Sequence, residues 1–344
     1  MKHKFLSKRY WKDNSTAMGA SEDKIKKYGD LINLSIGDTD LITDEIIING
    51  AFGDAKLGHT RYTETRGDPE LRQEIRNFYK EEYDMEVADK EIMVTTSGCI
   101  AMYLTLEAVL DDGDEVIIHT PCFTPYIQQI QLARGVPVEV ASYEEDGFQP
   151  RAENIEAAIT ERTKAIIVNT PTNPTGGSMT QETLESIAQV AEKYDLLVIA
   201  YDIYTLFSFE EEFMPFSSIK GMRERTVTIN SFSKNFLMTG WRIGYIVAPD
   251  YIVKTIQNIN ENVAFSAPSI SQRAGIYALR NRKAIQPAIY EEYKNRACAV
   301  AKKVNSIPNL SDLNPKGTFY LFVDITKTGL TSEGTAQRIL DKAR

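Results

Sequence analysis

A lysine stands among hydroxyl side chains and one arginine in residues 230–244, Asn-Ser-Phe-Ser-Lys-Asn-Phe-Leu-Met-Thr-Gly-Trp-Arg-Ile-Gly. Ser231 and Ser233 flank Lys234, and Arg242 follows shortly after. Serine hydroxyls and a planar guanidinium can converge on a phosphate. A lysine that has lost its proton, through burial and nearby cations, can attack a carbonyl and form a Schiff base. The combination predicts a phosphate site beside a nucleophilic amine, although a lone lysine in a loop would be interpreted as a solvated charge.

A second anion site is expected in residues 95–99, Thr-Thr-Ser-Gly-Cys, between a strand and a helix. Backbone amides at a helix N-terminus bind anions, and Gly98 allows a close approach. The turn has neither the glycine pattern of dinucleotide-binding proteins nor that of a Walker loop. Taken alone it could be a plain strand-to-helix turn. Beside the lysine segment we interpret it as part of the same phosphate site.

The run Ser-Phe-Ser-Lys-x(4)-Thr-Gly-Trp-Arg-x-Gly resembles the pyridoxal-phosphate attachment motif of the class I and II aminotransferases, an aspartate aminotransferase-like family of fold type I. The resemblance extends from Asn-Leu-Ser-Ile-Gly at 33–37 to Lys-Gly-Thr-Phe-Tyr at 316–320. It implies pyridoxal 5'-phosphate as cofactor and Lys234 as its covalent anchor and the catalytic proton shuttle. The phosphate would be held by five residues: Gly98, Cys99, Ser231, Ser233 and Arg242.

The resemblance implies roles for four further residues. Phe123 matches the position whose ring stacks on the pyridine face, and Asn173 matches the asparagine that hydrogen-bonds the ring oxygen. Gly37 matches a backbone amide that helps to hold the substrate carboxylate. Tyr62 matches a tyrosine that reaches the phosphate of the neighbouring subunit, which implies a homodimer with shared active sites. Without the resemblance, these loops would be interpreted as turn chemistry and exposed side chains.

One departure from the family pattern concerns the segment 201–204, Tyr-Asp-Ile-Tyr. The family has Asp-x-x-Tyr here, and its aspartate keeps the pyridine nitrogen protonated, so that the ring accepts electrons. Aligned on Tyr204, the aspartate position holds Tyr201, and Asp202 comes one residue later. Side chains alternate along a strand, so Asp202 points away from the ring unless a bulge re-aims it. All three are candidate cofactor-binding residues; either Asp202 reaches the ring or the electron sink is weakened, and the second is favoured.

The second departure concerns the C-terminal segment. In the family, the chain continues beyond the expected strand at 319–324 to an arginine that pairs with the substrate's α-carboxylate. The present sequence ends at Arg344, inside an amphipathic helical segment at 336–344. We therefore expect an incomplete small domain, and interpret Arg338 and Arg344 as solvated helix charges.

A parallel sheet must position these residues. Short apolar runs predict seven strands, at 92–96, 115–119, 136–141, 164–169, 196–200, 226–230 and 243–248. Segments with helical spacing lie between them, at 100–110, 155–159 and 184–194. Apolar strands that alternate with helices predict a mainly parallel sheet in a three-layer α/β/α arrangement. A ligand is then expected at the carboxyl ends of the strands.

A smaller α+β domain is expected from the pattern after residue 250. Helical stretches at 251–262, 269–279 and 290–304 precede a strand-like run at 318–325. We predict a large cofactor-binding domain at 45–265, and a smaller domain built from residues 1–44 and 266–344.

Composition narrows the class of protein. The 344 residues are 42% hydrophobic with a net charge of −9, which argues against a nucleic-acid or anionic-membrane partner. No apolar run approaches the roughly 20 residues that cross a bilayer. Three histidines argue against a His-based metal site or a Ser-His-Asp hydrolase, and three cysteines fit reduced thiols. A cytoplasmic protein without a metal is expected.

The leading hypothesis is an aminotransferase that moves an amino group between an α-amino acid and a 2-oxo acid through a Schiff base on Lys234. One alternative is a related lyase that cleaves a carbon–sulfur bond or eliminates at the β-carbon. A second alternative is a catalytically impaired protein that binds pyridoxal phosphate, and both Tyr201 and the expected lack of the C-terminal arm motivate it.

Overall fold

The sheet is the centre of the larger part of the molecule. The computed structural model describes residues 3–11 and 31–343. Its seven strands are ordered β1-β7-β6-β5-β4-β2-β3. They are β1 (Ile92–Thr95), β2 (Glu115–Thr120), β3 (Val136–Ala141), β4 (Thr163–Val168), β5 (Leu197–Tyr201), β6 (Thr226–Ser231) and β7 (Gly244–Val247). Strand β7 pairs antiparallel with β1 and β6, and the other pairings are parallel. All seven predicted strands are confirmed, to within one residue at each end.

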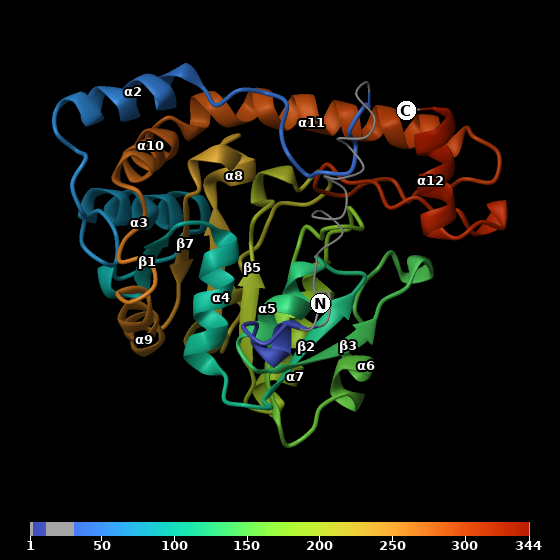
Figure 1. The fold of residues 1–344 in the computed structure, drawn as a ribbon, viewed down its shortest axis with the longest axis horizontal. Coiled ribbons are helices and arrows are strands. Elements are labelled where there is room, and N and C mark those ends of the chain that lie inside the picture. Colours follow the sequence, from blue (N-terminus) through green and yellow to red (C-terminus); the bar gives the residue numbers. More distant parts are fainter. Residues whose placement is uncertain (1–2, 12–30, 344) are drawn as a thin grey trace.

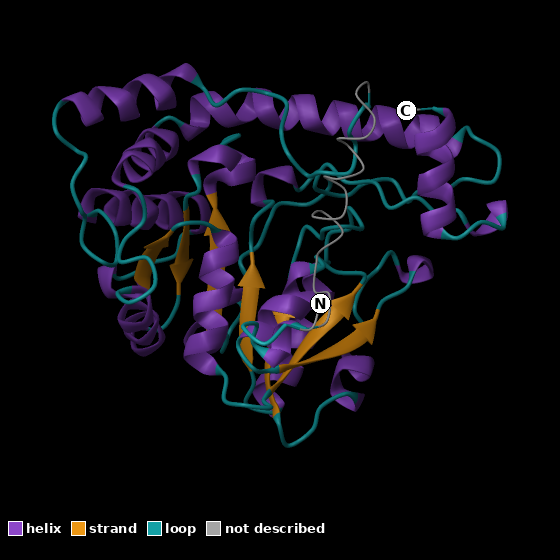
Figure 2. Ribbon diagram, in the orientation of Figure 1, coloured by secondary structure: helices purple, strands orange, loops and turns teal. Residues whose placement is uncertain are grey.

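Helices cover both faces of this sheet (Figure 2). The covering helices are α4 (Gly98–Val109), α5 (Pro125–Leu132), α6 (Ala152–Ala157), α7 (Gln181–Lys193) and α9 (Asp250–Asn260). Alternate strand residues enter two separate apolar clusters: Ile167 and Ile199 join one, and Ile166 and Val198 join the other. This two-residue period follows from the pleat of a strand. It produces two cores, one on each side of the sheet, and confirms the three-layer α/β/α class.

A second group of helices lies along the edge of the sheet and across its top (Figure 1). It comprises α2 (Glu45–Lys56), α3 (Pro69–Tyr83), α8 (Phe232–Asn235), α10 (Ser269–Arg280), α11 (Arg282–Asn305) and α12 (Ser332–Lys342). Helix α10 packs on α2 and α3. Arg273 of α10 donates from Nε to Asp54 of α2 at 2.6 Å, and from Nη1 to Asp68 at 3.3 Å. These ion pairs tie the chain after residue 265 to the larger part; the division into two domains remains a prediction.

The predicted strand at 318–325 is wrong. The described residues there form only isolated bridges, Ser311 with Asp324 and Ser208 with Gly317. No strand of the described residues lies alongside, so the backbone hydrogen bonds go to other elements: the amide of Thr318 donates to Phe207, at the end of a short 3-10 helix, at 2.9 Å. Apolar composition predicted the strand, but only Thr318 of this run is buried, Phe322 is exposed, and a strand also needs a partner strand for its ladder.

The predicted C-terminal helix is present in the described residues as α12, which begins at Ser332. Arg344 lies outside the described residues. Within residues 3–11 and 31–343, no helix has the length and apolar character needed to cross a bilayer. The same part of the chain holds no group of three or more His, Cys, Asp or Glu side chains that could hold a metal ion.

Candidate active site

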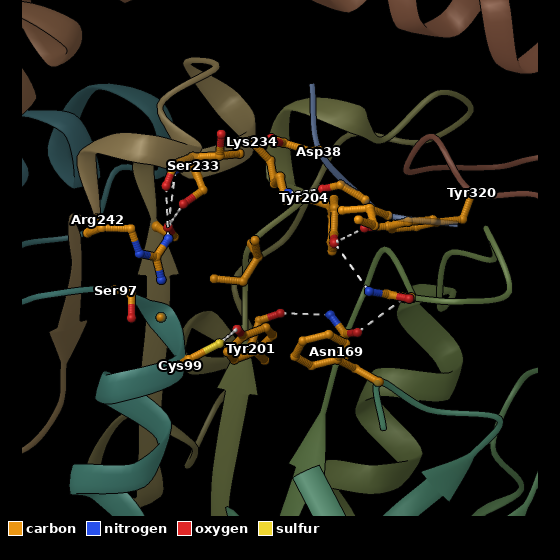
Figure 3. A pocket seen from close by; sticks show the side chains of 18 of the residues that line it. Asp38, Ser97, Cys99, Asn169, Tyr201, Tyr204, Ser233, Lys234, Arg242 and Tyr320 are labelled. Carbon is orange, nitrogen blue, oxygen red and sulfur yellow. Dashed lines mark hydrogen bonds between the residues drawn. The ribbon is translucent and has the colours of Figure 1, made fainter. Parts of the chain in front are cut away.

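A pocket lies at the carboxyl ends of the central strands (Figure 3). Its volume is about 390 Å³. That size suits a small organic ligand. Eleven of the thirteen predicted site residues line it: Gly37, Gly98, Cys99, Phe123, Asn173, Tyr201, Tyr204, Ser231, Ser233, Lys234 and Arg242. Tyr62 and Asp202 are not among the lining residues.

One side of the pocket gathers neutral donors and a cation. We call this set the anion cradle: Ser97, Gly98, Cys99, Ser231, Ser233 and Arg242. The hydroxyl of Ser231 donates to that of Ser233 at 2.9 Å and accepts from the Ser233 amide at 3.1 Å. Arg242 has a left-handed backbone (φ 53°) and donates from Nη1 to the Thr239 carbonyl at 2.9 Å. These short-range hydrogen bonds hold the hydroxyls and the guanidinium on the same side of the pocket (Figure 3).

The N-terminus of α4 supplies backbone amides to the cradle. The Ser97 hydroxyl caps this helix by accepting from the Ile100 amide at 3.2 Å. A β-carbon on Gly244 would lie 2.9 Å from the Gly98 nitrogen and 2.7 Å from the Asn230 carbonyl, so only glycine lets β7 approach the helix so closely. The partial positive charge of a helix N-terminus favours an anion at this position.

Lys234 lies where α8 faces the pocket. Its Nζ contacts the carbonyl oxygen of Gly37 and lies 5.7 Å from the centre of the Phe319 ring. Burial lowers the pKa of the Lys234 ammonium, and the charge of Arg242 adds to this, whereas Asp38 opposes it. A lowered pKa increases the share of neutral amine, which is the form that attacks a carbonyl or accepts a proton.

The opposite side of the pocket is aromatic. We call Tyr204 and Tyr320 the tyrosine wall. The hydroxyls of Tyr204 and Tyr320 are 2.8 Å apart, and Asn173 donates from Nδ2 to the Tyr204 hydroxyl at 3.3 Å. The Asn173–Pro174 peptide bond is cis. A ligand oxygen placed here would meet an amide and a phenol; the role of Asn173 that the resemblance implies stays a prediction.

Asn169, at the end of β4, orders this side of the pocket. Its Nδ2 donates to the Tyr201 carbonyl at 2.8 Å, and its Oδ1 accepts from the Asn173 amide at 3.2 Å. One buried side chain therefore joins the ends of two strands to the loop that carries Asn173. The sequence gives one signal for such a residue, a polar side chain directly after a buried strand.

Tyr201 enters the pocket and Asp202 does not. The ring of Tyr201 stacks on that of Phe123, with centroids 6.2 Å apart and 21° between the planes. The amide of Asp202 donates to Ile229 at 2.8 Å, and its side chain is buried. Burial raises the pKa of the Asp202 carboxyl to about 8. Alternation along the strand turns the side chain of Asp202 away from the pocket, which is the alternative that the sequence favoured.

Two other predicted residues have surroundings that the sequence did not indicate. The ring of Tyr62 is 87% exposed and lies edge-on to Phe265, with centroids 5.0 Å apart, away from the pocket of its own chain. A β-carbon on Gly37 would lie 1.9 Å from the Tyr320 hydroxyl, so glycine is what allows these two segments to meet. The role of Tyr320 was missed because nothing near it in sequence indicates its contact with Tyr204.

Known proteins resemble this chain in both sequence and structure. The family model described as "Aminotransferase class I and II" matches residues 29–343. An aspartate aminotransferase of Pyrococcus horikoshii is 35% identical, over 94% of this chain and 83% of that protein. The aspartate/prephenate aminotransferase of Thermus thermophilus is 33% identical, over 95% of this chain and 85% of that protein. The solved structure of Thermus thermophilus aspartate aminotransferase with maleate superposes with a TM-score of 0.92 at 32% identity, covering 99% of this chain and 90% of that chain.

Proposed function

The chain belongs to the class I and II aminotransferase family, and we propose that it moves an amino group between an α-amino acid and a 2-oxo acid with pyridoxal 5'-phosphate attached to Lys234. The observation that carries this proposal is the position of Lys234. Its part-buried amine, with a lowered pKa, lies between the anion cradle and the tyrosine wall. A ligand with a carbonyl, a phosphate and a ring oxygen matches this arrangement: the carbonyl meets Lys234, the phosphate meets the anion cradle, and the ring oxygen meets the tyrosine wall.

The residues present fit pyridoxal phosphate. The cradle offers hydroxyl, amide and guanidinium donors for a phosphate, and Phe123 offers a flat face for the ring. Asn173 and Tyr204 offer hydrogen bonds to a ring oxygen. Pyridoxal phosphate supplies a carbonyl that condenses with amines and a ring that takes up the electrons released at the substrate's α-carbon.

Lys234 is proposed to act twice. Its Nζ would hold the carbonyl carbon of the cofactor, and the amine of the substrate would compete with it for that carbon. The freed Nζ remains in the pocket as a neutral base, because burial disfavours its charged form. It accepts the α-proton of the amino acid and returns a proton during transfer. The carbonyl of Gly37 contacts Nζ and so orients the amine between these steps.

The relatives support amino transfer over the alternatives. The similar proteins are named for aspartate, for aspartate and prephenate, and for arginine with pyruvate, and all carry names of aminotransferases or transaminases. Their substrates differ, so the substrate of this chain belongs to the general class of α-amino acids. The lyase would share Lys234 and the cradle, and differs only in its products.

We also propose a homodimer in the cytoplasm. Tyr62 and Phe265 form an exposed aromatic pair, and Leu57 and Val263 are exposed large apolar side chains. A second copy that covered them would bring Tyr62 to its partner's cradle. Cys99, Cys122 and Cys298 are free, which fits a reducing compartment.

The test is to mix the purified protein with pyridoxal phosphate and then with single amino acids, while the visible absorption of the bound cofactor is followed. Amino transfer predicts loss of the visible band together with one equivalent of 2-oxo acid. Release of ammonia would support the lyase instead. A spectrum that no amino acid changes would contradict the proposal, and a Lys220→Ala variant, altered at an exposed lysine, is the matched control.

A further inference from the structure

We infer that Tyr201 is the residue that faces the ring nitrogen of the bound cofactor, so that this chain presents a phenol hydroxyl to that nitrogen and no carboxylate. The inference rests on the proposed function. It concerns how strongly the ring of the cofactor can withdraw electrons. It therefore bears on how readily the chain carries out amino transfer.

The constitution of pyridoxal phosphate fixes where the nitrogen must lie. The carbonyl carbon is bonded to one ring carbon, with the ring oxygen on one side of it and the phosphate arm on the other. The ring nitrogen lies across the ring from the carbonyl carbon. Once the protein partners of the carbonyl, the oxygen and the phosphate are placed, the direction of the nitrogen follows.

The pocket supplies these three partners on three different sides (Figure 3). Lys234 lies at the top of the view, Ser233 and Arg242 lie on the left, and Tyr204 lies to the right of the cradle. Tyr201 lies at the bottom of the same view, across the pocket from Lys234. A ring that satisfies the first three sides directs its nitrogen toward Tyr201.

Packing fixes Tyr201 in this position. Its backbone belongs to β5, and its carbonyl accepts from Asn169 at 2.8 Å. Its ring lies against Phe123 and edge-on to Tyr126, with the Tyr126 centroid 5.4 Å away. Its hydroxyl is 4.0 Å from the Cys99 sulfur. These contacts hold the phenol at the floor of the pocket.

No carboxylate among the described lining residues can take this place. Asp38 is the one carboxyl that lines the pocket in the described part of the chain, and it lies on the side of Lys234 (Figure 3). Asp202 is buried close to Tyr79 and Tyr245, and it contributes to the raised pKa values of both tyrosines. Tyr79 is on α3 and Tyr245 is on β7, so the carboxyl of Asp202 lies toward these elements and is not among the groups that line the pocket.

A phenol acts on a ring nitrogen differently from a carboxylate. Burial raises the pKa of Tyr201, so its hydroxyl stays protonated and uncharged and can donate a hydrogen bond to the lone pair of the nitrogen. A carboxylate would instead stabilise a proton, and a positive charge, on the nitrogen. The nitrogen in this chain therefore keeps its lone pair, and the uncharged ring is a weaker acceptor of the electrons from the substrate.

The experiment loads the full-length protein with pyridoxal phosphate labelled with ¹⁵N in the ring, and records the nitrogen resonance at neutral pH. We expect the resonance of an unprotonated pyridine nitrogen in the wild type and in Tyr201→Phe, a near-isosteric variant. Tyr201→Asp is expected to shift the resonance upfield, to the protonated position. Asp202→Asn, the matched control at the neighbouring carboxyl, is expected to leave it unchanged.

Two outcomes overturn the inference: a protonated nitrogen in the wild type, or a resonance that moves in Asp202→Asn and not in Tyr201→Asp. Reduction with borohydride and peptide mapping, run on the same samples, separates this failure from that of the proposed function. A cofactor attached to Lys234 with a protonated nitrogen overturns the inference alone. If no cofactor attaches to Lys234, both proposals are overturned.

Discussion

The anion cradle and the tyrosine wall face each other across one pocket, but they hold their side chains in different ways. The hydrogen bonds of the cradle are local: Ser231 binds Ser233 two residues away, and Arg242 binds Thr239 three residues away. The wall depends on distant partners, since Tyr204 and Tyr320 are 116 residues apart. A local arrangement is encoded in one segment, whereas a long-range arrangement exists only when the whole fold is formed.

Lys234→Ala should have the largest effect on turnover, because Lys234 lies between the anion cradle and the tyrosine wall. It removes the amine that holds the cofactor and moves the proton, so turnover should fall by roughly a hundredfold to ten-thousandfold. Steady-state assays of 2-oxo acid formation measure this. The exposed Lys220→Ala should keep full activity. Full activity in Lys234→Ala would show that neither half needs this amine.

Asp202→Asn tests the region behind the tyrosine wall. The folded pKa of about 8 lies above the ordinary value of 3.8, so the stability that the protonated carboxyl contributes is full below pH 3.8 and is lost as pH rises to about 8. The asparagine variant cannot ionise, so near pH 8 it should be more stable than the wild type by roughly a few kcal/mol. Near pH 4 the difference should vanish.

Urea unfolding of the wild type and Asp202→Asn at the two pH values measures this difference. Asp195→Asn is the matched control, because that carboxylate is 92% exposed. Asp195→Asn should change the free energy of unfolding by the same amount at both pH values. An equal difference at both pH values would mean that Asp202 is already ionised in the folded protein.

Arg242→Lys tests the cradle alone. Lysine keeps the charge but loses the planar fork, so the Kd for pyridoxal phosphate should rise by roughly tenfold, a loss of about 1.5 kcal/mol. Titration of the cofactor-free protein measures the affinity. Because the cradle contacts the phosphate and not the ring, the absorption spectrum of the bound cofactor should not change. An unchanged Kd would remove Arg242 from the phosphate site.

Tyr320→Phe tests the wall alone, and its effect should be the smallest. It removes the 2.8 Å hydrogen bond to Tyr204, which is expected to contribute about 1 kcal/mol. The spectrum of the bound cofactor should shift, because Tyr204 loses a partner beside the ring oxygen. The Kd should change only a few-fold. Tyr251→Phe, at an exposed tyrosine, is the control; a Kd loss larger than that of Arg242→Lys would reverse the comparison.

The same contrast explains what the sequence could predict. The strands and the lysine segment were predictable because each is a contiguous run whose residues act on their near neighbours. Alternation along a strand also favoured Tyr201 over Asp202 at the pocket, before any contact was known. The pairing of Tyr320 with Tyr204 had no such signal, since only the folded chain brings Gly37 and residue 320 together.

Two errors of element assignment have physical causes. The segment 318–325 is apolar like a strand, but the described structure offers it no partner strand. Helix α11 begins at Arg282, eight residues before the predicted start, and contains Pro287. Proline usually ends or kinks a helix, so the early turns were not recognised from the sequence.

The most direct test of the central claim is to identify the residue that carries the cofactor. The wild-type protein is mixed with pyridoxal phosphate, reduced with borohydride, digested and analysed by mass spectrometry. The account predicts a phosphopyridoxyl group on the peptide that contains Lys234, and its absence from that peptide in Lys234→Ala. A label on another lysine, or no label on the wild type, would contradict it.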